Sequence, residues 1–412
     1  MEAGISARGL SREREMQLTE LLAHSPLGGS GAYRWMVCPG SVKLSAGVQD
    51  SESEYASEGT TAHSVGEWCI THGLDAWELM QRGDKPGDGY TLPDGEELFV
   101  SKDMADAVQV YLNAVRAHPD QNQGNTFVEK AFHCPTLHEL YYGKADFVYT
   151  DAKNRVLHVY DYKHGAGIVV DVQWNPQCMY YGAGILEELQ LWTEIDVVTL
   201  HIVQPRGWHS DGPLRKWSIK TTDLEKWLDG DLIPSMKEAM VSRETKSGEH
   251  CRFCPARGRA CPQLIADFKE LEELMTIMNQ KGGAKALTNA ELSRFLSTFN
   301  TAKIAAKAAT ETAFARLQSG KQIKGFKIVH SRTNREWKDG AERALKKEFG
   351  DEALSTPALL SPAKIDGLPG GSDATARWAF KPTGGLAVAA ESDARSAVGK
   401  DTKSLFKNKE KK

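Results

Sequence analysis

The chain has 412 residues, a hydrophobic content of 41% and a formal net charge of −4 at pH 7. This length allows two or three domains with a substantial core, and the acidic balance excludes a uniformly basic nucleic-acid-binding chain, so any contact with DNA must come from local patches. No apolar run approaches the length of a membrane span, and the N-terminus has no signal-peptide pattern. These features predict a cytoplasmic protein without membrane contacts.

The first forty residues contain a polar lead-in and one cysteine. Residues 1–30 are polar and end in a Gly/Ser-rich stretch, which predicts a flexible lead-in. Cys38 follows, directly before a Pro-Gly pair. By itself this position is typical of an ordinary buried thiol.

A helix is predicted next. Thr60 or Thr61 is a suitable N-cap for a helix that runs to about Ile70. His63 would lie on this helix, either as a ligand or as an ordinary core or surface histidine. Residues 81–97 are rich in Gly, Pro and Asp and predict a loop, and residues 102–117 predict a further helix.

A predicted hairpin gathers charged side chains. Residues 147–150 and 156–162 have strand patterns and flank a turn-prone stretch, so that Asp146 lies opposite Asp161 or one pair away, at ~5 Å. Lys163 points to the same side of its strand as Asp161. Two close carboxylates repel unless a cation lies between them, and oxygen ligands suit Mg²⁺ or Mn²⁺. The alternative is a surface hairpin with a solvated Asp–Lys pair.

The elements around the hairpin complete a mixed α/β core. Residues 127–132 predict a strand, on which Glu129 either faces the same site or is solvated. An Asn-Pro pair at 175 and 176 predicts a helix start, and the helix would carry Gln177 and Tyr181 on one face, as site residues or as simple packing residues. Residues 197–204 predict a buried strand.

A cysteine cluster follows a predicted helix over residues 223–242. Cys251, Cys254 and Cys261 have the spacing C-x2-C-x6-C. Thiolates so arranged bind Zn²⁺ or iron–sulfur clusters, and Cys38 is the candidate for the fourth ligand. Three free thiols in a loop are the alternative.

The remainder predicts mainly helices. Residues 264–280 and 289–318 have helical periodicity, residues 325–331 predict a strand and 340–348 a helix. From Gly399 the chain carries six lysines against two acids, which indicates a disordered tail or a weak non-specific nucleic-acid contact. The predicted organisation is a flexible N-terminus (1–30), a core domain (31–265), a helical extension (266–350) and a low-order region with a basic tail (351–412).

The order of these signals resembles a known family. Cys38, His63, Asp146, Asp161-x-Lys163, Gln177-x-x-x-Tyr181 and the three later cysteines resemble, over about residues 32–265, the RecB/AddB-type exonuclease branch of the PD-(D/E)XK superfamily. That branch includes the CRISPR-associated four-cysteine nucleases, and the layout also resembles a phage-encoded family. The resemblance implies a restriction-endonuclease-like α/β core, with a mixed central sheet flanked by helices and a mainly helical C-terminal extension.

The resemblance also implies roles for individual residues. Asp146, Asp161 and Lys163 would be catalytic, with Gln177 and Tyr181 supporting the lysine or touching the DNA strand. The metal, Mg²⁺ or Mn²⁺, would be held by His63, Asp146, Asp161 and the Tyr162 carbonyl. Cys38, Cys251, Cys254 and Cys261 would hold a [4Fe–4S] cluster, with Zn²⁺ as the alternative.

The implied function is a metal-dependent DNA exonuclease of phage recombination, repair or replication, acting in the host cytoplasm. Its expected partners are DNA and a single-strand annealing or other recombination or replication protein. The alternative is a catalytically silent DNA-binding or assembly protein that retains the nuclease fold.

Overall fold

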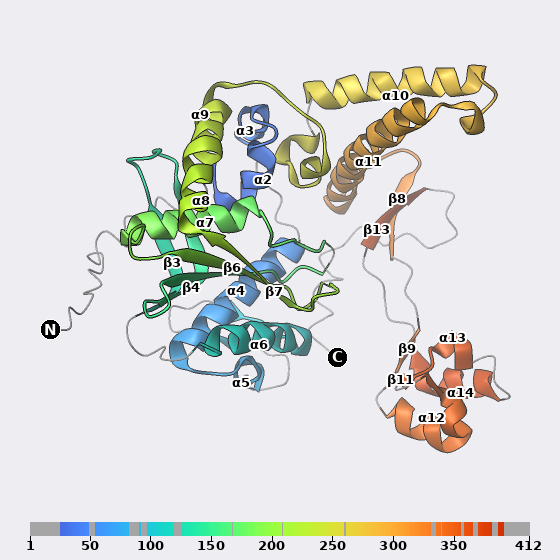
Figure 1. Cartoon of the computed structure of the whole chain (residues 1–412). Helices are drawn as coiled ribbons and strands as arrows, with labels where there is room; N and C mark the ends of the chain where they lie inside the picture. The colour runs from blue at the N-terminus through green and yellow to red at the C-terminus, as the bar shows by residue number, and fades with distance from the viewer. Residues whose placement is uncertain are drawn as a thin grey trace. The chain divides into compact units, whose positions relative to one another are not determined.

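The structure is a computed structural model (Figure 1). It describes residues 25–48, 54–81, 90–91, 97–118, 125–166, 168–207, 209–258, 261–330, 335–338, 340–355, 358–365, 370–380 and 386–390. The chain separates into two compact units, residues 1–302 and residues 303–412. The first unit contains the predicted site, and the predicted basic tail lies outside the described residues.

A five-stranded mixed sheet with the strand order β3-β4-β5-β6-β7 forms the centre of the first unit. Its strands are β3 (Thr126–His133), β4 (Tyr142–Asp151), β5 (Val156–Tyr162), β6 (Val197–Val203) and β7 (Leu214–Lys220). Only the β5–β6 pair is parallel, because helix α7 (Pro176–Leu189) connects these two strands. The sheet is therefore the mixed α/β core that the sequence predicts.

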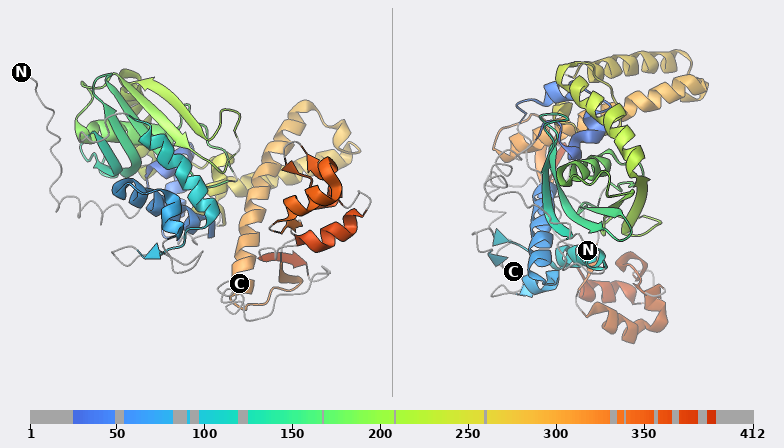
Figure 2. Two further views of the ribbon diagram at one scale, coloured as in Figure 1. Left: turned by 90° about the horizontal axis from the view of Figure 1, so that it is seen from below. Right: turned by 60° about the vertical axis from the view of Figure 1, so that its left-hand side comes forward.

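Helices cover both faces of this sheet (Figures 1 and 2). One face packs on α4 (Glu54–His72), α5 (Ala76–Gln81) and α6 (Lys102–Arg116). The other face packs on α2 (Ala32–Trp35), α3 (Gly40–Ser45), α7, α8 (Thr221–Trp227) and α9 (Ile233–Val241). Each face has its own core of buried apolar side chains, so the sheet is the shared wall of a three-layer unit.

Local sequence signals set the ends of the elements that bear the site. The side chain of Asn175 accepts a hydrogen bond from the backbone N–H of Cys178, and Pro176 occupies the first turn of α7. Ser101 caps α6 in the same way. The β4–β5 hairpin closes through residues 152–155, and its first pair is Asp151 with Val156. These features confirm the predicted hairpin and helices.

The predicted cap of helix α4 is wrong. The helix begins at Glu54, and Thr61 lies inside it, where its hydroxyl donates to the Ser57 carbonyl one turn earlier at 3.1 Å. A Thr hydroxyl can accept a hydrogen bond as an N-cap, or donate one to the carbonyl four residues earlier within a helix. The cap-like pattern therefore does not mark the helix start. The predicted loop at 81–97 lies mostly outside the described residues, which include only the short strands β1 (Tyr90–Thr91) and β2 (Glu97–Leu98) there.

The helix predicted over 223–242 is confirmed as a helical segment from Thr221 to Val241, in which a π-helical stretch at Leu228–Leu232 separates α8 from α9. Pro234 lacks the N–H that a regular α-helical turn requires there. One other expectation needs correction. Part of the predicted flexible lead-in is packed. Leu27 is fully buried, and the Gly28 carbonyl accepts a hydrogen bond from Trp35 Nε1 at 3.1 Å.

Two long helices follow the sheet. They are α10 (Pro262–Gln280) and α11 (Asn289–Gln318), and an ion pair between Arg294 and Glu270 at 2.7 Å joins them. Helix α11 crosses the boundary between the units. The sequence instead predicts domain boundaries at 265 and 350, because a change in composition indicates where helices occur but not to which compact unit a helix belongs. No helix among the described residues is long and apolar enough to cross a membrane.

The second unit combines short strands and helices. Its elements are β8 (Phe326–His330), β9 (Glu336–Trp337), α12 (Ala341–Phe349), β10 (Leu354–Ser355), β11 (Ala358–Leu359), α13 (Pro362–Ile365), α14 (Gly371–Trp378), β12 (Ala379–Phe380) and β13 (Leu386–Ala390). A small core forms around Leu345, Ile365 and Ala374. The described part of the predicted low-order region therefore contains packed helices and strands, since small apolar residues suffice for a core of this size.

Helix α7 approaches the sheet closely at Gly184. A Cβ atom at this position would lie 2.1 Å from a ring carbon of Phe132, which is fully buried. We expect Gly184→Ala to lower the free energy of unfolding by at least ~1–3 kcal/mol, since the ring must shift in a packed core. The matched control is Gly59→Ala in α4, where nothing lies within 4 Å, so alanine should raise stability by ~0.5–1 kcal/mol. Urea unfolding measures both, and equal effects would contradict the packing argument.

Candidate functional site

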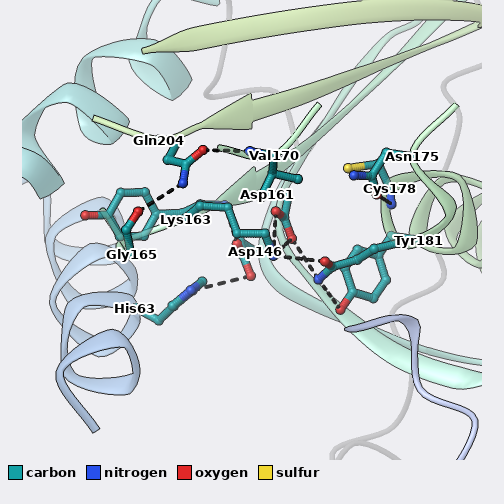
Figure 3. Close-up of polar contacts among 12 residues, drawn as sticks. His63, Asp146, Asp161, Lys163, Gly165, Val170, Asn175, Cys178, Tyr181 and Gln204 are labelled. Carbon is teal, nitrogen blue, oxygen red and sulfur yellow. Dashed lines mark hydrogen bonds and ion pairs between the residues drawn. The ribbon is translucent and has the colours of Figure 1, made fainter. Parts of the chain in front are cut away.

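The central hairpin brings Asp146 and Asp161 together at its open end. The β4–β5 pair farthest from the turn is Phe147 with Tyr160. Asp146 directly precedes Phe147, and Asp161 directly follows Tyr160. The Tyr162 backbone N–H donates to Asp146 Oδ2 at 2.7 Å. The Asp146 carboxylate therefore takes the place of a backbone acceptor at the end of the ladder (Figure 3).

A hydrogen-bonded network fixes the lysine beside the second aspartate. Lys163 Nζ lies 2.9 Å from Asp161 Oδ2 and donates to Gln177 Oε1 at 2.9 Å. Gln177 Nε2 in turn donates to Asp161 Oδ1 at 3.1 Å and to the Tyr181 hydroxyl at 3.2 Å. The first two turns of α7 thus hold both members of the Asp161–Lys163 pair in a single arrangement.

The opposite side of Asp146 faces helix α4. His63 Nδ1 lies 3.5 Å from Asp146 Oδ1, and ligand atoms of His63, Glu129 and Asp146 all lie within 4.8 Å of one another. Glu129 reaches this position from β3 through a left-handed backbone conformation, with φ at 49°. Such a conformation is uncommon for a non-glycine residue and is often found at functional sites.

The environment of these groups perturbs their pKa values. Burial raises the pKa of Asp161, which is 3% exposed, and Asp146 raises it further, against the opposing effect of Lys163. Burial also raises the pKa of Glu129, to about 7. Burial lowers the pKa of His63, but Asp146, Glu129 and Asp161 together raise it to about 9. Burial would also raise the pKa of Asp146, but His63 and the Tyr162 N–H, by contrast, hold it below its usual value. A divalent cation would relieve the repulsion that raises the pKa of Asp161 and Glu129.

A second polar network holds the side chain of Tyr162 at its hydroxyl group. Its hydroxyl lies 2.9 Å from His164 Nδ1, and His164 Nε2 lies 3.3 Å from Glu58 Oε1. Arg206 contacts both residues, because its Nη1 lies 2.8 Å from Glu58 Oε1 and 2.6 Å from His164 Nε2. Because Tyr162 also donates its backbone N–H to Asp146, this network positions a strand end that carries the site.

The four predicted cysteines line one cavity, together with Ser41, Leu44, Lys246, His250, Ala256, Arg257 and Leu264. Cys38 lies between α2 and α3, Cys251 lies in a 3₁₀ turn (Glu249–Phe253) and Cys261 directly precedes α10. The backbone N–H of Lys246 donates to Cys38 Sγ at 3.4 Å. The structure thus brings together the N-terminal cysteine and the cluster that lies more than two hundred residues later.

Gly40 permits this approach. Its backbone N–H donates to the Glu244 carbonyl at 2.7 Å, and a Cβ atom would lie 2.6 Å from the same oxygen. The two segments could not pack this closely with any side chain at position 40. Burial raises the pKa of Cys38, and it raises that of Cys251 to about 11. Ionised thiolates in this cavity would therefore need a cation beside them.

Four thiols around one cavity are a donor set that fits a thiolate-bound group. Thiolates in such a set bind either a single zinc ion or an iron–sulfur cluster.

Every predicted site residue lies in one of these two centres. The oxygen-rich centre contains His63, Asp146, Asp161, Tyr162, Lys163, Gln177 and Tyr181, and the thiol cavity contains the four cysteines. The sequence left Glu129 open and missed Glu58, His164 and Arg206. Of these, only His164 carried a local signal, as the residue directly after Lys163.

The fold and the two centres define an α/β protein with a mixed five-stranded sheet, a carboxylate–lysine centre at the end of β4 and β5, and a separate four-cysteine cavity. A family model described as "Protein of unknown function (DUF2800)" matches residues 24–396, and the chain belongs to this family. No solved structure matches the chain.

Proposed function

We propose that this protein is a metal-dependent nuclease of the PD-(D/E)XK superfamily, of the RecB/AddB type, that hydrolyses DNA phosphodiester bonds. The observation that carries the proposal is the buried Asp161–Lys163 pair, held by Gln177 next to Asp146. A solvated surface pair would not have its carboxylate 3% exposed with a glutamine bonded to both partners.

The residues present fit a hard divalent cation. Asp146, Asp161, His63 and the Tyr162 carbonyl would hold it, and Glu129 is a further candidate ligand because its carboxylate approaches His63 and Asp146. This donor set is rich in oxygen and suits Mg²⁺ or Mn²⁺. A ligating histidine must be neutral, so binding would release the proton that His63 otherwise holds. When bound, the cation would supply positive charge at the phosphoryl oxygens.

Lys163 would act on the phosphate directly. Burial lowers the pKa of Lys163, but Asp161 outweighs this effect and keeps the ammonium protonated. The charged ammonium would lie beside the scissile phosphate and orient the attacking water, and it would stabilise the charge that develops in the transition state. Gln177 would restrain the lysine in the position that this role requires.

The four cysteines would hold a [4Fe–4S] cluster that ties the two ends of the nuclease domain together. The support for this proposal is that all four thiols line one cavity, and Zn²⁺ is the alternative occupant. DNA is the proposed substrate, and a phage recombination or replication protein is the proposed partner.

The test is an assay on end-labelled linear and circular DNA with Mg²⁺, Mn²⁺ or EDTA. We expect the linear DNA to be degraded with either metal and neither DNA to be degraded in EDTA, with loss of activity in Asp161→Ala. Exonuclease action predicts that the circular DNA survives. If the parent protein binds DNA but cleaves none at any metal concentration, it is instead a silent binding or assembly protein.

A further inference from the structure

Trp174 is an exposed aromatic residue of the first unit that the proposed chemistry does not use. It is 58% exposed and lies directly before the N-cap of α7. Its backbone is left-handed, with φ at 53°, a conformation that is rare for a bulky residue and that costs ~1 kcal/mol or more. An exposed tryptophan in a strained conformation needs a reason other than core packing.

A second tryptophan supports the first. The ring of Trp217, on β7, lies 4.8 Å from that of Trp174, measured between centroids, at an interplanar angle of 50°. Asn175 Nδ2 donates to the Asp171 carbonyl at 2.8 Å and closes the loop on the other side. The exposed indole of Trp174 therefore packs against the Trp217 ring.

The backbone before Trp174 is held by the side chain of Gln204, which is 1% exposed. Its Nε2 donates to the Gly165 and Ile168 carbonyls at 2.9 and 2.7 Å, and its Oε1 accepts from the Val170 backbone N–H at 3.1 Å (Figure 3). Arg215, also buried, donates to Gln204 Oε1 at 2.8 Å and to the Val170 carbonyl at 3.0 Å. These hydrogen bonds fix the backbone of Ile168 and Val170 on the buried side chains of Gln204 and Arg215.

Residues 168–175 lie beside the proposed active site, because they lead directly into α7, whose first turn carries Gln177. Strand register gives the lateral distance, because β6 separates β5 from β7 and adjacent strands lie ~4.8 Å apart. Trp217 is therefore two strands, or ~10 Å, from the strand of Asp161. It is in register, through Leu200, with Val159, two residues before Asp161.

We propose that Trp174, backed by Trp217, is a stacking platform for an unpaired nucleobase of a single-stranded DNA segment next to the proposed active site. This inference rests on the proposed nuclease function. A rigid, flat aromatic surface suits a base, since every base has a π face, and stacking of this kind contributes ~1–3 kcal/mol per base. A duplex would not use the platform, because its bases are already stacked on one another.

The surrounding charge predicts how the platform binds. Asp171, in the same loop, is exposed, and His209 lies 3.8 Å from it, so the platform is not a basic surface. Its contribution comes from stacking and not from phosphate contacts. Losing it should weaken binding while leaving the salt dependence unchanged, because only phosphate contacts release counterions.

The experiment is fluorescence anisotropy of a labelled short oligothymidylate with the full-length protein in EDTA, over a series of salt concentrations. We expect Trp174→Ala to bind ~5- to 100-fold more weakly with the same salt slope, and Trp174→Phe to retain most of the affinity. Trp77→Ala is the matched control, because Trp77 is also exposed but lies on α5, and it should bind as the parent does. Circular dichroism verifies that each variant is folded.

The outcomes separate this inference from the proposed function. If Trp174→Ala loses affinity as expected but the parent hydrolyses no DNA with Mg²⁺ or Mn²⁺, the platform stands and the nuclease proposal fails. If the parent hydrolyses DNA and Trp174→Ala binds as tightly as the parent, the platform is overturned and the nuclease proposal stands. A parent that binds no oligothymidylate, or a change in the salt slope, also overturns the platform.

Discussion

Asp161→Asn is expected to abolish both metal binding and DNA hydrolysis, whereas Lys163→Met is expected to abolish hydrolysis and leave metal binding intact. The two side chains are 2.9 Å apart but have different roles in the proposed mechanism, as ligand and as phosphate-directed cation. Removing one charge-stabilising group from an active site commonly costs ~10²–10³-fold in rate, and we expect at least this loss for each variant. Isothermal titration with Mn²⁺ measures binding, and the assay on linear DNA measures hydrolysis.

The same pair makes a prediction about stability. Lys163→Met leaves the buried Asp161 carboxylate without its cation, and an unpaired buried charge is destabilising. The melting temperature of this variant should therefore fall in EDTA and recover with Mn²⁺, which would replace the missing charge. Lys153→Met is the control, because Lys153 lies in the exposed hairpin turn and should leave binding, hydrolysis and melting unchanged. If Asp161→Asn binds Mn²⁺ and digests DNA as the parent does, the assigned metal centre is wrong.

Cys38→Ala is expected to lose the cofactor and much of the stability of the first unit. Cys38 and Cys251 line the same cavity although more than two hundred residues separate them. In the chain-entropy account, a closure of this length stabilises the fold by ~5 kcal/mol. An anaerobic preparation of the parent should be brown with broad visible absorbance and bound iron, and Cys38→Ala should be colourless with a lowered melting temperature.

Cys134→Ala is the matched control for this experiment. Cys134 is as buried as Cys38 but does not line the cavity, so its replacement should cost only packing energy and keep the colour. A colourless parent with stoichiometric zinc would replace the iron–sulfur proposal with a zinc site. Full retention of the cofactor in Cys38→Ala would remove this residue from the ligand set.

The predictions that succeeded depended on short-range patterns. The β4–β5 hairpin follows from alternating strand residues around a turn, and α7 follows from its Asn-Pro start. Asp161, Lys163 and Gln177 then come together because α7 begins close to the point where β5 ends. The predictions that failed concerned boundaries, as at the start of α4, where a threonine in a helix resembles a threonine at its end.

The sequence by itself determined the hairpin, the capped helix that follows it, and the three closely spaced cysteines, because each is encoded within about twenty consecutive residues. Tertiary structure alone decided that Glu129 reaches His63 through a left-handed backbone, and that Cys38 packs against the later cluster through Gly40. It alone also placed Trp174 against Trp217. These contacts join segments distant in the sequence, and they are set by sheet register and close packing, which no local periodicity records.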